Sequence, residues 1–458
     1  MQTAGIMIID GEVPFERVFE HYAARVHLVP RLRQRLVFVP MNLAHPKWVD
    51  DPNFDVRNHI VHHDLPRGTP LSQALAAICE INEGVMDRSI PLWKFHVVTG
   101  VPDTTLVLQQ AHHAMVDGAS AVEMTTLLFD FEPDAPAPEP AAEWSPPPLP
   151  TEAELVAEAM KENADAALRG NPMAFAGPGL QAQMQNAVAS MTRFVTEPAM
   201  TAPWNASMLG PKRKIEFTEH DFSAFREMRR VLGGTINDLV LTIITEGAAR
   251  YLAAHGEHTA NQKLRIMCPV NVRTESGEGD MGNRVSAIFP MFPAYPMDLM
   301  ARHLQVCAET QAVKSSGAAQ AITALQENAP PVPPVGLAPL LLVGTPYDPT
   351  RMLADNPPPV PPQFGARPPS FGINFVVTNV PSVMVPQYLA GHRISGQTTV
   401  MMMSGNLGLG VAVISFNQKL IINLTSDPRL LPDLELLDQH INDVVAELLT
   451  MVREQPAA

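Results

Sequence analysis

The chain has 458 residues, of which 46% are hydrophobic and only 17% are charged. This composition is sufficient for a large buried core and excludes a mostly disordered chain, and the length indicates two domains rather than one. Lys and Arg number 32 against 47 Asp and Glu, so the formal net charge is -15. Such a chain is repelled by nucleic acid and by anionic lipid head groups, and an anionic cofactor would need a local basic patch.

The cysteines and the first residues bear on the cellular compartment. Cys79, Cys268 and Cys307 show no paired spacing, which fits a reducing compartment and predicts neither a disulfide framework nor a cysteine zinc site. The start MQTAGIMIIDGE lacks the basic segment of a signal peptide. No apolar run approaches the ~18–20 residues that span a bilayer. We therefore expect a soluble or peripheral protein.

The first third of the chain has the pattern of a mixed α/β region. Its expected strands are Met1–Ile9 and Thr104–Gln110, and its expected helices are Phe15–Val26 and Pro70–Val85. Pro133–Pro150 is too rich in proline for a helix or a central strand and indicates an extended connector.

Helical periodicity follows the connector, up to residue 205. One apolar stripe there predicts a helix packed on the body of the protein, and it consists of Leu180, Met184, Ala187, Val188, Met191 and Val195. A second proline-rich stretch, Pro330–Pro369, is expected to form a long loop with an apolar tip.

A second α/β region begins near Lys212. Its expected helices are Phe222–Val231, Asn237–His255 and a last helix capped by Asp433. Its expected strands are Lys214–Phe217, Leu264–Val270, Val285–Phe292, Phe371–Val377, Thr398–Met403, Gly408–Phe416 and Leu420–Leu424. We therefore divide the chain into an N-terminal subdomain (1–132), a connector with crossover helices (133–205) and a C-terminal subdomain (206–458).

Two adjacent histidines mark the stretch that carries chemistry. An apolar strand ends at His112-His113, Asp117 follows on the turn, and Gly118 opens an amphipathic helix. A neutral imidazole, with an ordinary pKa of about 6.5, is the natural general base at neutral pH. The alternative roles are structural: hydrogen bonds at a strand end for the histidines, and a helix-start cap for Asp117.

HHAMVDG (residues 112–118) matches the HHxxxDG motif of the coenzyme A-dependent acyltransferase superfamily. Further segments, in order along nearly the whole chain, resemble motifs of the wax ester synthase/diacylglycerol acyltransferase family. They are PRLRQRL (30–36), FDVRNHI (54–60), PLW (91–93), ND (237–238), NVR (271–273), GN (282–283) and TNVP (378–381). By this resemblance the chain is identified as a member of the family.

The resemblance implies an α/β fold with two chloramphenicol-acetyltransferase-like subdomains, a long crossover and a tunnel between the halves. It implies that His113 is the catalytic base, with His112 and Asp117 completing the catalytic motif. Asp117 is expected to pair with Arg273 and to order the turn. Structural support is expected from Gly118, Asn237 and Asp238. Pro91, Leu92 and Trp93 are expected to line the tunnel or to belong to the core.

The implied reaction moves a long-chain acyl group from acyl-CoA to a fatty alcohol or diacylglycerol, which gives wax ester or triacylglycerol. Acyl-CoA is then a co-substrate, and neither a tightly bound cofactor nor a metal nor a nucleic acid partner is expected. The implied location is cytoplasmic, with peripheral contact to the inner membrane or lipid inclusions. The apolar tip of the loop Pro330–Pro369 is expected either to make this contact or to pack onto the protein body. The alternatives are a same-fold enzyme for another hydroxyl or amine, and a non-catalytic lipid-binding relative.

Three further features of the sequence are weak indications of a functional site. His59, His62 and His63 with Asp64 fit no standard zinc spacing. The run Lys212–Lys214 is expected to be either a solvated turn or a contact for the phosphates of coenzyme A. Gly118–Ala121 lacks the second glycine of a hydrolase nucleophile elbow, so Ser120 is not expected to act as a nucleophile. The family's leader before the first strand is expected to be missing or truncated.

Overall fold

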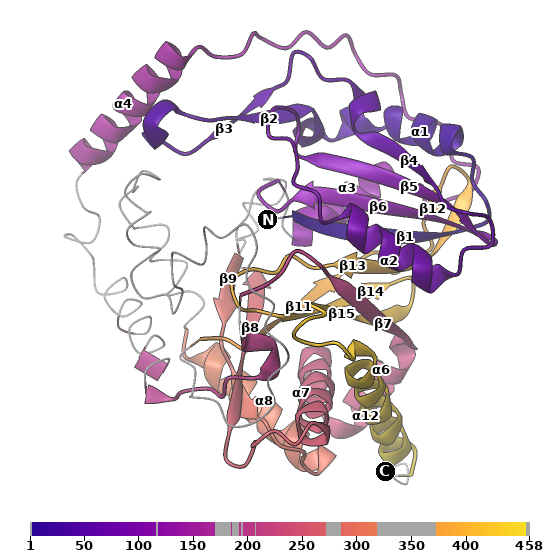
Figure 1. The fold of residues 1–458 in the computed structure, drawn as a ribbon, viewed down its shortest axis with the longest axis vertical. Coiled ribbons are helices and arrows are strands. Elements are labelled where there is room, and N and C mark those ends of the chain that lie inside the picture. The colour runs from indigo at the N-terminus through magenta and orange to yellow at the C-terminus, as the bar shows by residue number, and fades with distance from the viewer. Residues whose placement is uncertain are drawn as a thin grey trace.

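The computed structural model describes residues 2–115, 118–169, 185, 192–193, 196–206, 208–271, 285–317 and 372–454. Two α/β halves lie one above the other in Figure 1, and each is built on a mixed sheet that carries helices. The α/β class predicted from the sequence is confirmed. The crossover stripe and the loop Pro330–Pro369 fall largely or wholly outside the described residues.

The first sheet has six strands in the order β12-β13-β1-β6-β5-β4. β1 (Gln2–Asp10) pairs antiparallel with β6 (Thr104–His112), and β4 pairs parallel with β5. Side chains alternate between the two faces, so α1 (Phe15–Ala23) covers one face and α2 (Leu71–Ile81) packs on the other. The remaining strands are β4 (Ile60–Asp64), β5 (Trp93–Val101), β12 (Tyr388–Leu389) and β13 (His392–Val400).

The first sheet takes two of its strands from the far end of the chain. β13 pairs antiparallel with β1, from Ala4 opposite Val400 to Ile9 opposite Ile394. The chain thus passes from one half into the other and back, which ties the halves together. The boundary at residue 206 stays a prediction, because residues beyond it contribute to both sheets.

The second sheet joins strands of both orientations in the order β10-β8-β11-β14-β15-β7, with β9 paired to β8. Its helices are α6 (Phe222–Leu232), α7 (Ile236–Ala254), α8 (Leu299–Ser315) and α12 (Leu434–Glu454). Its strands are β7 (Lys214–Asp221), β8 (Lys263–Asn271), β9 (Val285–Ile288), β10 (Met291–Pro293), β11 (Phe375–Pro381), β14 (Leu409–Phe416) and β15 (Lys419–Ser426).

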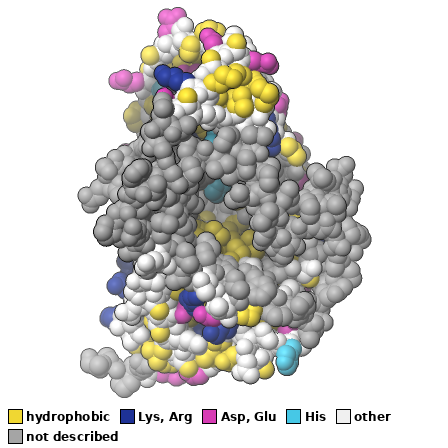
Figure 2. All heavy atoms as spheres, turned by 90° about the vertical axis from the view of Figure 1, so that its left-hand side faces the viewer, with side chains coloured by type: hydrophobic (Ala, Val, Ile, Leu, Met, Phe, Trp, Pro, Cys, Tyr) yellow, Lys and Arg dark blue, Asp and Glu magenta, His cyan; other side chains and the backbone are white. Residues whose placement is uncertain are grey.

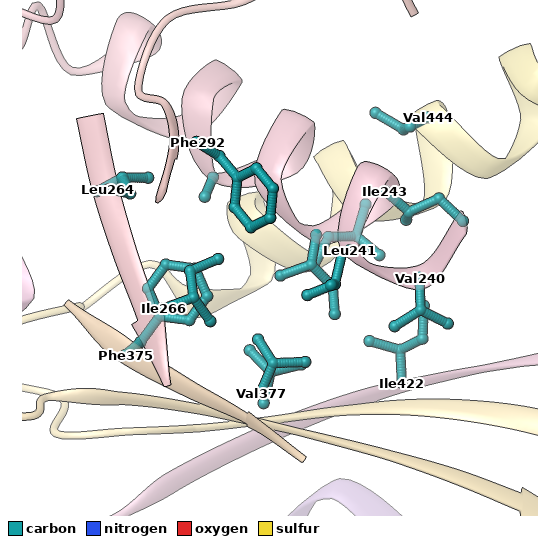
Figure 3. Close-up of a cluster of buried hydrophobic side chains, with 14 of the residues drawn as sticks. Val240, Leu241, Ile243, Leu264, Ile266, Phe292, Phe375, Val377, Ile422 and Val444 are labelled. Atoms are coloured by element: carbon teal, nitrogen blue, oxygen red, sulfur yellow. The ribbon is translucent and has the colours of Figure 1, made fainter. Parts of the chain in front are cut away.

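A large apolar core lies between this sheet and its helices (Figure 3). α7 is apolar on nearly all sides, which is the expected pattern of a helix enclosed by other elements. Val240 of α7 and Ile422 of β15 lie close together in the view, and Phe292 fills the space beside Leu241. This core makes the second half a rigid support for the strands that reach the boundary between the halves.

Most of the remaining elements lie around the first half, and the turn Pro203–Asn205 joins the second core through Trp204. β2 (Gln34–Val37) and β3 (Lys47–Asp50) form a two-stranded ribbon, and the ammonium of Lys47 pairs with Glu158 and Glu162 of α4. The other helices are α3 (Gly118–Leu128), α4 (Glu152–Arg169), and the short 3-10 turns Val26–Leu28, Pro30–Arg33, Pro40–Asn42, Val56–Asn58 and Pro203–Asn205.

Candidate active site

The two histidines lie where β6 ends and the chain turns toward α3. His112 is the last residue of β6, opposite Gln2 of β1, and its amide donates to the Leu92 carbonyl at 2.9 Å. The Met115 amide donates to the His112 carbonyl at 2.9 Å, and the Met115 side chain is 1% exposed in the first core. The turn that carries His113 is therefore held by backbone bonds on one side and by a buried anchor on the other.

The ring of His112 has a defined hydrogen-bond partner. Its Nδ1 accepts from the Ala114 amide at 3.1 Å, so a neutral ring carries its proton on Nε2. Burial, followed by positive charges that include Arg88 and His113, lowers the pKa of His112. His112 is therefore neutral at pH 7 and presents an N–H donor, whereas a general base needs a free nitrogen lone pair.

A pocket of about 240 Å³ adjoins this turn, between the two halves of the molecule. Figure 2 shows a hollow on one face, at the level of the boundary between the halves, with hydrophobic side chains and a histidine at its floor. The pocket is lined from the first half by Gln2, Asn82, Glu83, Val85, Met86, Arg88, Leu92 and His112, and from the second half by Pro211, Arg213, Met401, Met402 and Met403.

The polar part of the pocket wall is built by strand and helix ends. Asn82 follows the last residue of α2, and its Oδ1 accepts from the Gln110 side chain at 3.0 Å. The amide group of Gln2 donates to the carbonyls of Asn82 and Gly84. These bonds join β1, β6 and the end of α2 beside His112, which makes this part of the wall preorganised.

His113 follows His112 on the turn and is half-buried. The pocket beside this turn is lined by His112 and not by His113, so the role of His113 as general base stays a prediction. Asp117 and Arg273 lie outside the described residues, so their pairing stays a prediction. Gly118 is the first residue of α3, as the sequence suggested.

The segment Pro91–Trp93 divides between the pocket and the core. Leu92 lines the pocket and is 1% exposed. The Trp93 indole N–H donates to the Leu32 carbonyl at 2.7 Å, and the ring stacks on His59 with centroids 4.5 Å apart. Trp93 belongs to the first core and positions β5, while Leu92 is the member of the motif that contacts the pocket.

The second histidine cluster has structural contacts. His59 hydrogen-bonds through Nδ1 to the Trp93 carbonyl at 2.8 Å, His62 contacts the Thr99 hydroxyl, and His63 lies 2.9 Å from His96. Among the described residues, no group of three or more His, Cys, Asp or Glu side chains is arranged to hold a metal ion. The contacts of this cluster account for its histidines without a ligand.

Asn237 and Asp238 lie at the start of α7. Asp238 forms a capping box with Thr235: the Thr235 amide donates to its carboxylate at 2.9 Å, and the Asp238 amide donates to the Thr235 hydroxyl at 3.1 Å. The Thr310 hydroxyl of α8 donates to the same carboxylate at 2.7 Å. These contacts are within the second half and position α7 and α8; neither residue lines the pocket.

A model of the wax ester synthase/diacylglycerol acyltransferase catalytic domain matches residues 7–240. The chain belongs to this family. The C-terminal domain of the same family matches residues 281–449. A putative diacylglycerol O-acyltransferase of Mycobacterium tuberculosis is 27% identical over 96% of this chain and 83% of its own length. A probable diacylglycerol O-acyltransferase of that organism, tgs1, is 26% identical over 99% of this chain and 92% of its own length.

Solved structures share the fold of this family member. The wax ester synthase/diacylglycerol acyltransferase from Marinobacter aquaeolei VT8 aligns with a TM-score of 0.61 at 19% identity, covering 99% of this chain and 95% of that chain. The first condensation domain of the calcium-dependent antibiotic synthetase aligns with a TM-score of 0.59 at 12% identity, covering 100% and 92%. The predicted two-subdomain acyltransferase fold is confirmed.

Several pocket residues carried no signal in the sequence. Arg88 and Asn82 lie between α2 and β5, and Met401–Met403 follow β13, more than 280 positions away in the chain. Arg213 was noted as part of a basic run, and it is the member of Lys212–Lys214 that lines the pocket, whereas Lys214 pairs with Glu435. Only folding brings these groups beside His112.

Proposed function

We propose that this protein transfers a long-chain acyl group from acyl-CoA to the hydroxyl of a fatty alcohol or diacylglycerol. The products are then wax ester or triacylglycerol and free coenzyme A. The observation that carries this proposal is the histidine pair of the family motif at the end of β6, whose first member, His112, lines a pocket between the two halves. The names of the relatives, diacylglycerol O-acyltransferases, support the acceptor class.

The chemistry needs one base and two substrates in the same space. His113 takes the proton of the acceptor hydroxyl while the oxygen attacks the thioester carbonyl, and collapse of the tetrahedral intermediate breaks the C–S bond. The proton on His113 then passes to the departing thiolate. Holding both substrates together replaces a bimolecular encounter, and in well-oriented cases this is worth roughly 7–11 kcal/mol. The reaction balances without an acyl-enzyme.

The substrates set where the protein must work. Among the described residues, no helix is long and apolar enough to cross a membrane. Fatty alcohols and diacylglycerols dissolve in bilayers and lipid inclusions, so the enzyme reaches them from the cytoplasm as a peripheral protein. Acyl-CoA is the co-substrate in this proposal, and the chemistry above requires neither a metal nor a bound cofactor.

A thiol-release assay tests the proposed function. Purified protein is incubated with palmitoyl-CoA and hexadecanol, dioleoylglycerol or an amine acceptor, and free thiol and lipid products are measured. We expect thiol release that depends on the hydroxyl acceptor, with palmityl palmitate or triacylglycerol as product. Release only with an amine would point to the other acceptor class, and bound acyl chains without any thiol release would point to a non-catalytic lipid-binding protein.

A further inference from the structure

Two guanidinium groups reach the pocket from opposite halves of the molecule. Arg88 comes from the segment between α2 and β5, and Arg213 comes from the residues just before β7. The chain as a whole carries a net charge of -15, so most of its surface repels an anion. The pocket beside His112 carries these two cations and one carboxylate, Glu83, so its lining is net positive and provides the local basic patch that an anionic substrate would need.

Arg88 has an uncompensated charge. Its side chain is exposed, and its guanidinium carbon lies 6.0 Å from the centre of the Phe38 ring. The carboxylate of the neighbouring Asp87 is turned to Ser89, whose amide and hydroxyl donate to it at 2.8 and 2.6 Å. Arg88 forms no ion pair with any residue that the structure describes, so its donors are available to a ligand.

The guanidinium of Arg213 is fixed by two hydrogen bonds and has further N–H donors that these bonds do not use. Its Nη1 donates to the carbonyls of Gly210 and Lys212 at 2.6 and 2.7 Å, which fixes the guanidinium at the pocket wall. Within the described part of the chain no acceptor takes the hydrogens of Nε or Nη2. The nearby carboxylate of Asp427 is occupied by Arg429 at 2.8 Å and by the Gly210 amide at 2.7 Å. Arg213 therefore offers a fork of donors from a rigid support.

The pocket has an outer and an inner end. Val85 is 92% exposed and Arg88 is exposed, so these residues mark the opening to solvent. Leu92 is 1% exposed and lies beside His112, so it marks the inner wall. The wall also carries four thioether side chains, which are apolar and adapt to a flexible ligand: Met86, Met401, Met402 and Met403.

This arrangement fits a ligand with phosphates at one end and an uncharged arm that leads inward. We propose that Arg88 and Arg213 bind phosphate groups of the acyl-CoA, so that the pantetheine arm passes the methionines toward His112, the residue before His113 on the turn. The assignment rests on the proposed function for the identity of the substrate. Arginine suits this role because its planar fork binds phosphate oxygens through two hydrogen bonds.

The test compares an acyl donor that carries phosphates with a truncated donor that lacks them. Kinetics are measured for wild type, Arg88→Gln and Arg213→Gln with palmitoyl-CoA and with the palmitoyl thioester of N-acetylcysteamine, which has no phosphate. The loss of one charge-assisted phosphate contact should raise KM for palmitoyl-CoA about 10-fold and change kcat little. KM for the N-acetylcysteamine thioester should not change. Arg230→Gln, an exposed arginine on α6, is the matched control and should behave as wild type.

Direct binding separates this inference from the proposed function. Desulfo-coenzyme A is titrated into each variant by calorimetry, and wild-type binding should weaken with added salt, because phosphate contacts are screened. Arg88→Gln should bind about 10-fold more weakly, and Arg88→Lys should recover part of the loss. If wild type transfers acyl groups from palmitoyl-CoA but Arg88→Gln keeps its KM and its affinity, the inference is wrong and the proposed function stands. If Arg88→Gln weakens binding but wild type transfers nothing, the proposed function is wrong instead.

Discussion

Glu246 on α7 and Arg302 on α8 form an ion pair with Nε and Oε2 2.5 Å apart, and 1% of each side chain is exposed. Oε2 also accepts from the Met297 amide at 3.2 Å, Oε1 accepts from Arg250 at 3.0 Å, and Arg302 donates to the carbonyls of Pro293 and Tyr295. The remaining donors and acceptors of the pair are thus used within the second half. A buried pair is tolerated under such conditions. Removing Glu246 leaves Arg302 without a carboxylate, whereas removing Arg302 leaves Glu246 with Arg250 as its remaining cation.

Removing one charge of this pair should destabilise the second half. Glu246→Gln should lower the free energy of unfolding by about 3–5 kcal/mol, measured by urea denaturation, and Arg302→Met should lower it by less, because Arg250 still pairs with Glu246. The double variant Glu246→Leu/Arg302→Met should regain most of that loss, because it replaces both charges by apolar groups of similar volume. Additive losses in the double variant would contradict the interpretation of the pair as a mutually compensating unit.

His113→Ala removes the proposed base. The rate of thiol release should fall about 10²–10⁴-fold, the usual contribution of a positioned base, while thermal unfolding should change little. His45→Ala, at an exposed histidine on the segment before β3, is the control and should keep full activity. A His113→Ala variant with near-normal turnover would remove His113 from the mechanism.

Two substitutions of His112 separate its contact in the turn from its contact in the pocket. His112→Asn keeps an acceptor near the place of Nδ1 for the Ala114 amide but removes the N–H that faces the pocket. It should keep its stability and lose about 3–10-fold in activity, the effect of one hydrogen bond. His112→Gln keeps a donor near the place of Nε2, so it should lose about 1 kcal/mol of stability and retain more activity. If His112→Asn were instead the less stable and the more active of the two variants, the roles assigned to Nδ1 and Nε2 would be reversed.

The elements with strong local signals could be predicted from the sequence almost to the residue. The expected helix Asn237–His255 is α7 (Ile236–Ala254), because its cap and its apolar pattern are both local. The expected strand Thr398–Met403 is instead β13 (His392–Val400), since its ends depend on pairing with β1, nearly 400 positions earlier. The expected strand Val285–Phe292 is two short strands, and each pairs with a different end of β8.

At the ends of helices and strands, the contacts of the side chains were harder to predict from the sequence than the positions of the ends themselves. Asp433 immediately precedes α12, as expected of a cap, but its carboxylate accepts from the Tyr251 hydroxyl at 2.6 Å and lies 2.9 Å from Nε2 of His255. It therefore links α12 to α7. The same limit applies to the site: the histidine motif is contiguous, whereas Arg88, Arg213 and the methionines come together only in the fold.

Asp238→Ala tests whether the Asn237-Asp238 segment is structural. Three donors, two from Thr235 and one from Thr310, would lose their acceptor at a side chain that is 4% exposed. The free energy of unfolding should fall by about 2–3 kcal/mol, and kcat per folded molecule should stay near wild type. Asp298→Ala, which removes the N-cap of α8, is the control and should cost about 1 kcal/mol. If Asp238→Ala lost turnover while its free energy of unfolding stayed unchanged, Asp238 would have a direct role in the reaction.

Asp438 on α12 predicts a pH dependence of stability. Burial raises the pKa of its carboxyl to about 6, against the partial compensation of a hydrogen bond from Asn442 at 3.0 Å. The folded state holds this proton more tightly than the unfolded chain does. The contribution of Asp438 to the free energy of unfolding is therefore fully present below about pH 4, and it is lost as pH rises through about 6.

Asp438→Asn removes this titration. The variant should be more stable than wild type at pH 7.5, by roughly 1–3 kcal/mol, and should lose that advantage at pH 4.5, where the native carboxyl is protonated. Urea denaturation of both proteins across this range measures the difference. Asp443→Asn, at an exposed position on the same helix, is the control and should show no such change. A constant difference between Asp438→Asn and wild type at all pH values would mean that the native carboxyl does not titrate in this range.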